Sequence, residues 1–468
     1  MKKDNKFTLI KEFEETINEN YKKENGIFYT DEHIVNLMFS EINMDKNSYI
    51  LDPCCGAGAF IVGAKQFKYE NICGIDSDIK AVKKCREITG FENIIQYDSI
   101  FNTSEKILKK LNLTQKPDLI IGNPPYVPSS KILDINVSQR EQLKYKMCGN
   151  LFVGAIYKAL DLVKQNGIIS YIIPKNFLHV NLYKDIRNEI LHCTKIISII
   201  DIGAYFKQVR GEQIILTLKK CKPDLDVDKV IFKKYENKNL VNLFEMKQSY
   251  YSDKIIIFKD EEDFNIYNKF MSSYKTMGDF CKGFVGRGTS NSKEAIKGKD
   301  IGKFMLKEKK IPTEGKKIFI QNIYSAEAGI IGCFAGNLEA TETVTVLTDT
   351  NADTCRFLLG VLHSRLCNYY LYKYCYNSSK LTMHTDAKYL LQIPIVDNFR
   401  EEVVYLVKQL EKTSYLSNKW HEIFEELNEL VYKIYEINDN DKEYIEKQIK
   451  QIQSKRWVND YGKKAANE

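Results

Sequence analysis

The nine residues Asp118-Leu-Ile-Ile-Gly-Asn-Pro-Pro-Tyr126 constrain this chain more than any other stretch. They form a short apolar run, typical of a buried strand, that ends on Asn123-Pro124-Pro125-Tyr126. Two successive prolines fix their φ angles and lack N–H donors, and the residue before a proline is pushed out of the helical region. The pattern predicts a stiff turn at the carboxyl end of a strand, where open α/β sheets bind their ligands.

This turn presents three groups that suit an aromatic amine. Asn123 supplies an amide oxygen, Pro124 a backbone carbonyl and Tyr126 an aromatic face. Two acceptors can hold both N–H groups of an –NH2 while the tyrosine stacks on the aromatic ring that carries it. The alternative is a strand-ending turn with a packing tyrosine, which a bare Asn-Pro would favour. The full tetrapeptide after an apolar strand favours the amine-binding interpretation.

Composition excludes several classes of protein. The chain has 468 residues, 44% hydrophobic and 28% charged, which predicts a globular protein of two or three domains. It has no apolar run near the ~20 residues of a membrane span, and no secretory signal at its N-terminus. The 12 cysteines include no CxxC pair and the 6 histidines no metal-ligand spacing. We therefore expect reduced thiols, no metal site, no membrane partner and a cytoplasmic location.

A glycine-rich turn follows the first predicted strand. Residues 48–60 have the pattern of strand, turn and helix, with Asp52 at the strand end and Gly56 and Gly58 in the turn. Small residues there let the backbone approach a ligand at a helix N-terminus. The GxGxxG dinucleotide pattern is not completed, because position 61 is isoleucine. The carboxylate instead favours a ligand with a cationic end over a pyrophosphate.

Two further strands, at 71–75 and 93–97, end on acidic residues. Asp76 lies about 20 residues after the glycine-rich turn, where an acid suits the two hydroxyls of a ribose. Asp98 can accept a hydrogen bond from an adenine amino group, with an ordinary loop acid as the alternative. We interpret Asp78 as a helix cap.

The alternation of strands with helical segments up to residue 219 predicts a doubly wound, mostly parallel α/β sheet. Four strands in a row end on a polar or turn motif, which predicts one ligand crevice. Upstream of them, Thr30 is placed to be the N-cap of a helix that runs to about residue 40.

In this order, the motifs of residues 20–220 resemble those of the gamma-class N6-adenine DNA methyltransferases of restriction-modification systems. The matching residues are Gly26 and Thr30, Asp52-Pro-x-x-Gly-x-Gly-x-Phe60, Gly74-Ile-Asp76, Asp98 and Asn123-Pro-Pro-Tyr126. The resemblance implies a Rossmann-like fold and S-adenosyl-L-methionine as methyl donor, with S-adenosyl-L-homocysteine as product. It also implies transfer to the N6 amino group of an adenine flipped out of double-stranded DNA.

The resemblance assigns a role to each matched residue. Thr30 and Asp52 serve the methionine end of the donor together with the backbone of the turn, Asp76 binds the ribose hydroxyls, and Asp98 binds the cofactor's adenine. The implied cofactor-binding residues are Thr30, Asp52, Gly56, Gly58, Asp76, Asp98 and Asn123. The implied catalytic residues are Asn123, Pro124, Pro125 and Tyr126, and the target base stacks against Tyr126 and Phe206.

Two positions depart from the family pattern. The proline that usually follows the motif threonine is Asp31 here. The aromatic residue expected early in the helix after the catalytic turn is Ala155 or Ile156, so one wall of the cofactor pocket lacks its usual side chain. A neutral amide is a weak base, so we expect Asn123 and Pro124 to orient the amine and stabilise developing charge, with no general base.

The second half of the chain has the features of a DNA-reading domain. We expect a boundary that separates a methyltransferase domain, residues 1–259, from a target-recognition domain, residues 260–468. Residues 282–317 carry 11 Lys or Arg against 4 Asp or Glu, which fits phosphate contacts, with a solvated charged face as the alternative. The candidate DNA contacts are Arg287, Lys309, Lys310, Lys316 and Lys317.

The order of strands and helices from 317 to 395 looks like the target-recognition domains of restriction-modification specificity subunits. A single predicted helix spans residues 355–374. Residues 401–455 predict two packed helices, with a coiled-coil partner interface as the alternative.

The sequence thus predicts a site-specific DNA adenine-N6 methyltransferase that associates with the nucleoid. Only 25 residues precede Gly26, too few for a fused nuclease domain, so we expect a stand-alone monomer with a separate cognate restriction endonuclease as a possible partner. One alternative is an RNA adenine or protein glutamine N-methyltransferase, which resembles shorter chains. Another is a catalytically inactive specificity subunit, against which the intact Asn123 motif argues.

Overall fold

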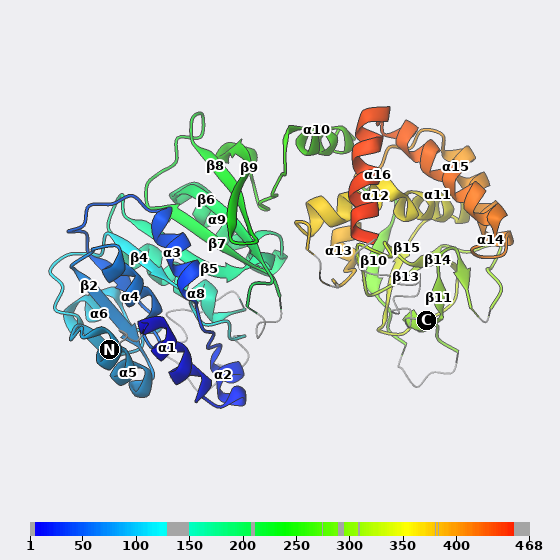
Figure 1. Ribbon diagram of the computed structural model, residues 1–468. Coiled ribbons are helices and arrows are strands. Elements are labelled where there is room, and N and C mark those ends of the chain that lie inside the picture. Colours follow the sequence, from blue (N-terminus) through cyan, green and yellow to red (C-terminus); the bar gives the residue numbers. More distant parts are fainter. Residues whose placement is uncertain are drawn as a thin grey trace. The chain divides into compact units, whose positions relative to one another are not determined.

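A computed structural model of the protein describes residues 5–128, 149–206, 211–273, 275–288, 294–307, 309–379, 381 and 383–453. The chain divides into two compact units, Met1–Ile256 (unit 1) and Ile257–Glu468 (unit 2), drawn in Figure 1. The expected boundary after residue 259 lies close to this division. Within the described ranges, no helix combines the length and the apolar character that a membrane crossing requires.

Unit 1 is built on a mixed sheet of nine strands in the order β3-β2-β1-β4-β5-β7-β6-β8-β9. The strands are β1 (Ile50–Asp52), β2 (Ile72–Asp76), β3 (Ile94–Gln96), β4 (Leu119–Gly122), β5 (Ile168–Pro174), β6 (Lys195–Gly203), β7 (Gln213–Lys219), β8 (Lys229–Glu236) and β9 (Asn239–Lys247). The first five are parallel, β7 is antiparallel to both β5 and β6, and β9 is antiparallel to β8. The predicted doubly wound, mostly parallel sheet is confirmed.

The chain reverses its direction of travel across the sheet at β1, which pairs with β2 on one side and β4 on the other. Helices α4 (Ala59–Gln66) and α5 (Ile79–Thr89) connect β1 to β2 to β3. Helices α6 (Ser104–Lys110) and α8 (Leu151–Leu162) connect β3 to β4 to β5. Because such crossovers are right-handed, the two pairs of helices cover opposite faces of the sheet. The switch point, where ligands bind in open α/β sheets, therefore lies between β1 and β4.

Three helices precede the sheet: α1 (Lys6–Glu15), α2 (Glu19–Asn25) and α3 (Glu32–Ser40). The charged segment of residues 11–25 does not form one continuous helix. Thr16 ends the first helix, and the Asn18 side chain caps the second by accepting from the N–H groups of residues 20 and 21. Helix α1 packs against α4 and α5.

Helix α2 ends on Gly26, which links this N-terminal segment to the Asn-Pro-Pro-Tyr turn. Gly26 has φ +63°, a left-handed conformation that glycine adopts without strain. A Cβ atom at this position would lie 2.6 Å from the backbone nitrogen of Tyr126. The glycine therefore lets the two backbone segments come into direct contact.

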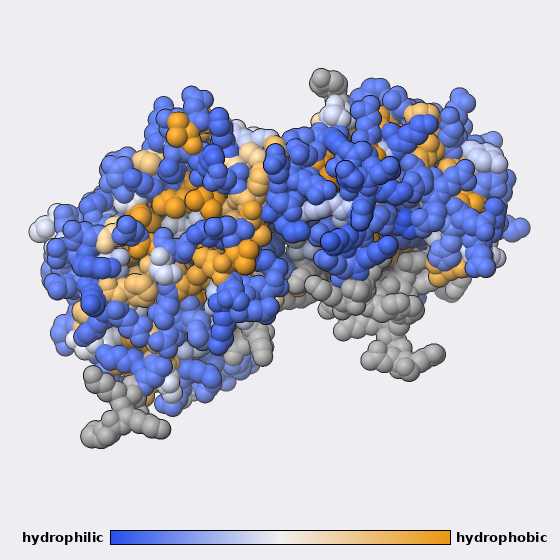
Figure 2. Space-filling view, turned by 45° about the horizontal axis from the view of Figure 1, so that its top comes forward, coloured by the Kyte–Doolittle hydropathy of each residue, from blue (hydrophilic) through white to orange (hydrophobic). Residues whose placement is uncertain are grey.

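The core of unit 1 contains side chains from α1, α3, α4 and the sheet, among them Phe7, Phe39, Phe60, Ile121 and Phe206. The remaining helices of this unit are η2 (Lys175–Leu178), η3 (Asn181–Tyr183), α9 (Lys184–Cys193) and η4 (Gln248–Tyr250). On the face drawn in Figure 2, apolar surface gathers on unit 1, whereas unit 2 is largely hydrophilic.

Unit 2 combines a four-stranded antiparallel sheet, β10-β15-β13-β14, with a short hairpin, β11-β12, and a set of helices. The strands are β10 (Lys282–Val285), β11 (Ile301–Gly302), β12 (Met305–Leu306), β13 (Lys317–Gln321), β14 (Gly332–Gly336) and β15 (Val344–Thr348). The helices are α10 (Glu261–Phe270), η5 (Met277–Asp279), η6 (Gly298–Asp300), α11 (Ala352–His363), α12 (Arg365–Tyr370), η7 (Leu371–Cys375), α13 (Ala387–Leu390), α14 (Arg400–Lys412), α15 (Asn418–Ile434) and α16 (Asp439–Gln453).

Two helix predictions for this unit are wrong. The helix predicted for residues 355–374 is divided, because Ser364 has extended backbone angles and its side chain caps α12 by accepting from the Cys367 N–H. The two helices predicted for 401–455 are three. The additional break falls at residues 435–438, where Glu436 has φ +52° and the Asn438 side chain accepts from the N–H of residue 441.

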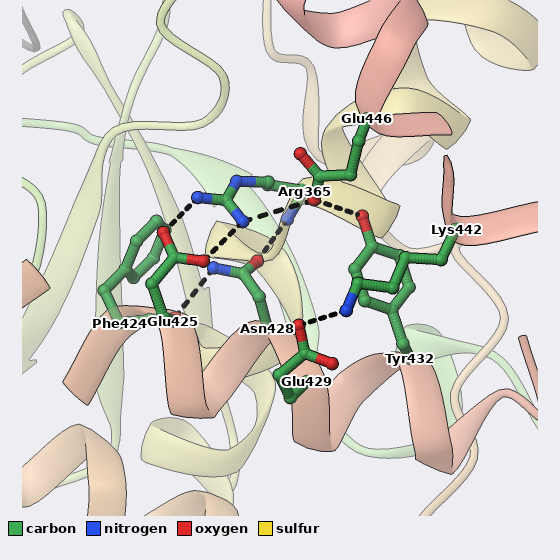
Figure 3. Close-up of polar contacts among 8 residues, drawn as sticks. All are labelled: Arg365, Phe424, Glu425, Asn428, Glu429, Tyr432, Lys442 and Glu446. Atoms are coloured by element: carbon green, nitrogen blue, oxygen red, sulfur yellow. Dashed lines mark hydrogen bonds and ion pairs between the residues drawn. The ribbon is translucent and has the colours of Figure 1, made fainter. Parts of the chain in front are cut away.

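Arg365, the first residue of α12, ties that helix to α15 and α16 (Figure 3). Its Nη1 atom lies 2.7 Å from Glu425 Oε2 and 3.2 Å from Glu446 Oε1, and its backbone N–H donates to Asn428 Oδ1 at 2.8 Å. The Tyr432 hydroxyl donates to the same Glu446 oxygen at 3.0 Å. One side chain thus joins three helices, and we call these five residues the Arg365 cluster.

Candidate active site

The ends of four neighbouring strands, β3, β2, β1 and β4, meet at one edge of the sheet and line a cavity of about 350 Å³. These ends carry the residues that the sequence predicted to share a crevice. The predicted site residues that line the cavity are Thr30, Asp52, Gly56, Asp76, Asp98, Asn123 and Pro125. Gly58, Pro124, Tyr126 and Phe206 are not among its lining residues.

The cavity is strongly acidic. Six carboxylic acids line it, and no Lys or Arg does so among the described residues. They are Glu14, Glu24, Asp52, Asp76, Asp78 and Asp98. Like charges around a cavity focus their potential inside it. The site is therefore suited to a cationic ligand and unsuited to a polyphosphate.

Asp52 has one satisfied and one unsatisfied oxygen. Its side chain is buried, with the residue 1% exposed, and its Oδ1 atom accepts the Cys54 N–H at 3.1 Å. No described residue donates to its Oδ2 atom. Burial raises the pKa of this carboxyl well above its usual range, and the charge of Asp76 adds to that effect. A buried carboxylate oxygen without a partner is costly unless a ligand satisfies it.

Backbone N–H groups fix both oxygens of Asp76. Oδ2 accepts from Gly56 at 2.8 Å and Oδ1 from Asp78 at 2.9 Å. Burial raises the pKa of Asp76, and these hydrogen bonds oppose the rise. Each carboxylate oxygen has a second lone pair, so the fixed carboxylate can still accept from two ligand hydroxyls. The Asp78 side chain accepts from the Lys80 N–H at 2.8 Å, which confirms the interpretation of Asp78 as a helix cap.

Asp98 organises the loop that follows β3. Its Oδ1 atom accepts the N–H groups of Ile100 and Phe101, each at 2.9 Å. Tyr97, Ile100 and Phe101 line the cavity beside it. The cavity therefore has aromatic and aliphatic side chains next to a carboxylate at this end.

Gly58 allows two helices to pack closely together. It caps α4 with φ +101°, and a Cβ atom there would lie 2.5 Å from the Cys85 thiol of α5. A larger residue at this position would push α4 and α5 apart. The requirement for glycine at residue 58 therefore comes from helix packing, whereas Gly56 lines the cavity together with its neighbours Cys55 and Ala57.

The Asn-Pro-Pro-Tyr turn is held by hydrogen bonds from two directions. The Asn123 amide nitrogen donates to Thr30 Oγ1 at 3.2 Å, and the Tyr126 hydroxyl donates to Asn123 Oδ1 at 2.8 Å. The same hydroxyl lies 3.0 Å from the carbonyl oxygen of Ile172 on β5. Thr30 thus fixes which end of the amide carries the acceptor, and Tyr126 is anchored to the sheet.

The prediction that Thr30 caps α3 is wrong. Asp31 is the N-cap, with its Oδ1 atom accepting the Ile34 N–H at 3.1 Å. Its Oδ2 atom accepts from the Tyr205 hydroxyl at 2.7 Å. The residue that replaces the family's proline therefore starts the helix, and this leaves the Thr30 hydroxyl for Asn123.

The aromatic residues near the turn differ in their surroundings. The Tyr126 ring lies 5.5 Å from that of Phe28 and 6.1 Å from that of Phe152, between centroids. Phe206 is 8% exposed and belongs to the apolar core. Its ring would have to leave that packing before a base could stack on it.

Sequence reasoning missed the contribution of the N-terminal helices. Phe13, Glu14, Ile17, Tyr21 and Glu24 of α1, α2 and their connection line the cavity. No motif marks these residues, because only the packing of α1 against α4 and α5 brings them to the site. Ala155 and Ile156, at the position of the family's aromatic residue, are buried and do not line the cavity, whereas Leu151 does.

Unit 2 has a second cavity of about 830 Å³, to which two predicted DNA contacts contribute. Six basic residues line it against Asp353 and Glu411, namely Lys303, Lys309, Lys310, Arg356, Lys408 and Lys412. Lys408 and Lys412 come from α14, about a hundred residues after the basic segment, so the sequence did not group them. We call this cavity the basic pocket.

The other predicted DNA contacts lie outside this lining. The Lys317 ammonium forms an ion pair with Glu339 at 2.9 Å, and its side chain is 19% exposed. The Arg287 guanidinium lies 5.8 Å from the ring centroid of Phe284. No group of His, Cys, Asp and Glu side chains suited to a metal ion occurs in the described parts of either unit.

The strand order, the acidic cavity at the switch point and the adjacent Asn-Pro-Pro-Tyr turn define unit 1 as a methyltransferase-like domain. Residues 2–207 match the family model of the Eco57I restriction-modification methylases. Over this part, the chain is similar to that family and to the type II methyltransferases.

Two of these relatives are the type II methyltransferases M.VspI of Vibrio sp. (strain 343) and M.HincII of Haemophilus influenzae. M.VspI is 27% identical over 220 residues, which cover 45% of this chain and 52% of that protein. M.HincII is 26% identical over 228 residues, which cover 47% of this chain and 38% of that protein. The chain thus spans about half or less of the length of these relatives.

Solved structures match more of the chain at lower identity. The type IIL restriction-modification enzyme MmeI has a TM-score of 0.59 and 11% identity, and the match covers 97% of this chain and 82% of that one. DrdV has a TM-score of 0.51 and 13% identity, with 87% of this chain and 59% of that one covered. These matches show that the fold of both units is shared with such enzymes.

Proposed function

We propose that the protein is a site-specific DNA methyltransferase that transfers a methyl group from S-adenosyl-L-methionine to the N6 amino group of adenine. The observation that carries the proposal is the acidic cavity, with its unsatisfied Asp52 oxygen, directly beside the Asn123 turn. A site for a cationic donor lies next to a site for an aromatic amine. The homology of residues 2–207 to type II methyltransferases supports the same reaction.

Each part of the donor would have a matching group in the cavity. Asp52 Oδ2 would accept from the ammonium of the methionine end, next to the buried Thr30. The fixed oxygens of Asp76 suit the ribose hydroxyls, and the loop at Asp98, with Ile100, suits the adenine ring. When bound, S-adenosyl-L-methionine supplies a methyl group on a sulfonium, and the acidic lining stabilises that positive charge.

The turn acts on the amine that receives the methyl group. The lone pair of adenine N6 is delocalised into the ring, so the nitrogen is a poor nucleophile. Asn123 Oδ1 and the Pro124 carbonyl would accept hydrogen bonds from its two N–H groups. These bonds would hold the nitrogen toward tetrahedral geometry. Asn123 Oδ1 already accepts from Tyr126, and its second lone pair leaves room for one further donor. The N6–methyl bond forms as the sulfur–methyl bond breaks, and the extra proton leaves to solvent.

DNA is the proposed substrate because unit 2 provides a second domain with a basic pocket. MmeI, which has the same fold over almost the whole chain, was solved in complex with DNA. An adenine inside a duplex is out of reach of the cavity and has to be flipped out, and Tyr126 is the aromatic residue of the turn on which it would stack.

Transfer of radiolabel from S-adenosyl-L-methionine tests the proposal. Duplex DNA should become labelled as N6-methyladenine, and equal amounts of RNA and of glutamine-containing protein should not. Label on RNA or protein alone would contradict the DNA assignment. Long-read sequencing of DNA from a host that expresses the chain would identify the methylated base and its sequence context together.

Asn123→Ala provides the test of mechanism. We expect transfer to be abolished or to fall at least a hundredfold, the loss typical of a missing transition-state hydrogen bond, while the donor still binds. Asn71→Ala, just before β2 and away from the cavity lining, is the matched control. Near-normal turnover of Asn123→Ala would overturn the proposed role of the turn.

A further inference from the structure

The last turn of α1 brings an additional carboxyl group to the cavity. Glu14 lines the cavity between Phe13 and Ile17, and its Oε1 atom lies 4.0 Å from the position of a Cβ on Gly56. Among the described residues, none forms a hydrogen bond with its carboxylate. A half-buried acid beside the glycine-rich turn therefore keeps its acceptors for a ligand.

The neighbours of Glu14 locate it at one end of the cavity. The charged groups that act on it are Asp76 of β2 and Lys22 of α2. The Lys22 ammonium is paired with Glu19 at 3.1 Å, so it does not neutralise Glu14 directly. Asp76 and Asp78 in turn act on Tyr21 of α2, so the two helices cover the Asp76 end of the cavity.

Burial raises the pKa of Glu14 to about 7, and the negative charge of Asp76 contributes to that rise. An acid in this environment gains from any ligand group that donates a hydrogen bond to it. Asp76 and Glu14 both lie close to Gly56, whose N–H donates to Asp76. A ligand with two neighbouring hydroxyls can bind both carboxyl groups.

We propose that Glu14 is a further cofactor-binding residue, which accepts a hydrogen bond from a ribose hydroxyl of the methyl donor opposite Asp76. This inference rests on the proposed function, because it assumes a nucleoside ligand in the cavity. It assigns a binding role to the helix that precedes every recognised motif. The N-terminal helix is then part of the cofactor site and not only a cover for α4 and α5.

Calorimetry on the full chain tests the assignment with two nucleosides. S-adenosyl-L-homocysteine carries both the ribose and the amino-acid end, whereas 5′-methylthioadenosine carries the ribose without the amino-acid end. Glu14→Gln keeps the shape of the side chain and removes its charge. Above pH 8, where Glu14 is ionised, we expect it to weaken both ligands by the same factor, about tenfold, because a hydrogen bond to a charged acceptor is replaced by a weaker one to a neutral amide oxygen.

Glu15→Gln is the matched control, because Glu15 is on the same helix with its side chain 64% exposed and does not line the cavity. It should leave both affinities unchanged. A loss for S-adenosyl-L-homocysteine alone would overturn the ribose assignment, and no loss for either ligand would overturn any binding role of Glu14. If the unaltered protein bound neither nucleoside, the proposed function itself would fail.

Discussion

Asp52 shows how one residue of this site serves binding at the expense of folding. Its carboxylate is buried, and one of its oxygens has no donor among the described residues. An unsatisfied buried polar group costs about 1–3 kcal/mol, and more when it is charged. The packing of unit 1 does not require an acid at this position, whereas the binding of a cationic ligand does. Such a trade of stability for function is common at binding sites.

Asp52→Asn should therefore stabilise the ligand-free protein and weaken donor binding. At pH values below the ordinary aspartate pKa of 3.8, Asp52 is protonated in both the folded and the unfolded chain. As the pH rises, the unfolded chain ionises first, because burial raises the folded pKa. The original protein then loses stability with increasing pH until the folded pKa is passed.

Thermal unfolding at several pH values provides the measurement. The melting temperature of Asp52→Asn should exceed that of the original protein at pH 8, and the difference should shrink toward pH 4. Asp226→Asn, at an exposed turn, should show no such difference. A lower melting temperature for Asp52→Asn at pH 8 would mean that the carboxylate is stabilising.

At the scale of elements, the Arg365 cluster holds the C-terminal helices of unit 2 together (Figure 3). The Arg365 side chain is 27% exposed and that of Glu446 18%, so this pair is less screened than an ordinary surface ion pair. Removing Arg365 leaves Glu425 and Glu446 without this cation. The interaction therefore contributes to how α12, α15 and α16 pack.

Arg365→Ala should destabilise unit 2 by about 1–3 kcal/mol, the usual cost of losing hydrogen bonds to a charged group. Trp420, which is buried in α15, belongs to unit 2, so its fluorescence during urea unfolding reports on this unit. Lys419→Ala, which breaks an ion pair whose side chains are 70% and 66% exposed, is the control and should have almost no effect. Equal midpoints for the two variants would refute a structural role for the cluster.

The basic segment, residues 282–317, is the second feature of unit 2 at this scale. We expect the triple change of Lys309, Lys310 and Lys316 to Ala to lower DNA affinity and to flatten its dependence on salt. Each lost phosphate contact reduces the slope of log K against log salt by roughly 1. Lys317→Ala alone should change the slope less, because Lys317 is already paired with Glu339.

Salt titrations of DNA binding supply these slopes, and methylation mapping shows whether the recognised sequence changes. We expect the sequence to stay the same. Phosphate contacts fix position and not base identity. An unaltered salt slope in the triple variant would remove the basic segment from the list of DNA contacts.

At the scale of the whole molecule, the described residues of unit 1 line one candidate active site, and we expect unit 2 to act as one recognition domain. The sequence shows no internal repeat. A palindromic DNA site is normally bound by a two-fold protein, with each half on one half-site. A single copy of this chain has no such symmetry. It should therefore recognise an asymmetric sequence and methylate one adenine on one strand.

Strand-resolved methylation mapping tests that expectation, and sedimentation of the protein on its DNA gives the number of copies bound. One methylated strand and one bound copy are the expected results. N6-methyladenine on both strands of a palindrome would contradict them. The exposed faces of α14, α15 and α16 would then be the first region to examine for a dimer interface.

The sequence by itself determined the sheet and the ends of its strands. Apolar runs that stop on Asp52, Asp76 and Asn123 require buried strands with polar ends, and alternation with helices requires parallel neighbours. These are local patterns, because hydrophobic periodicity and turn chemistry act over a few residues. For the same reason Asp78 was recognised as a cap from its position alone.

Only the tertiary structure decided which residues from distant segments meet at the cavity. The hydrogen bond between Thr30 and Asn123 joins residues that are 93 positions apart in the sequence. Glu14 lies at the site because α1 packs against α4 and α5. Phe206 lies in the core because the surrounding side chains bury its ring. Contacts of this kind depend on how whole elements pack, and the stretch of sequence around each residue does not contain that information.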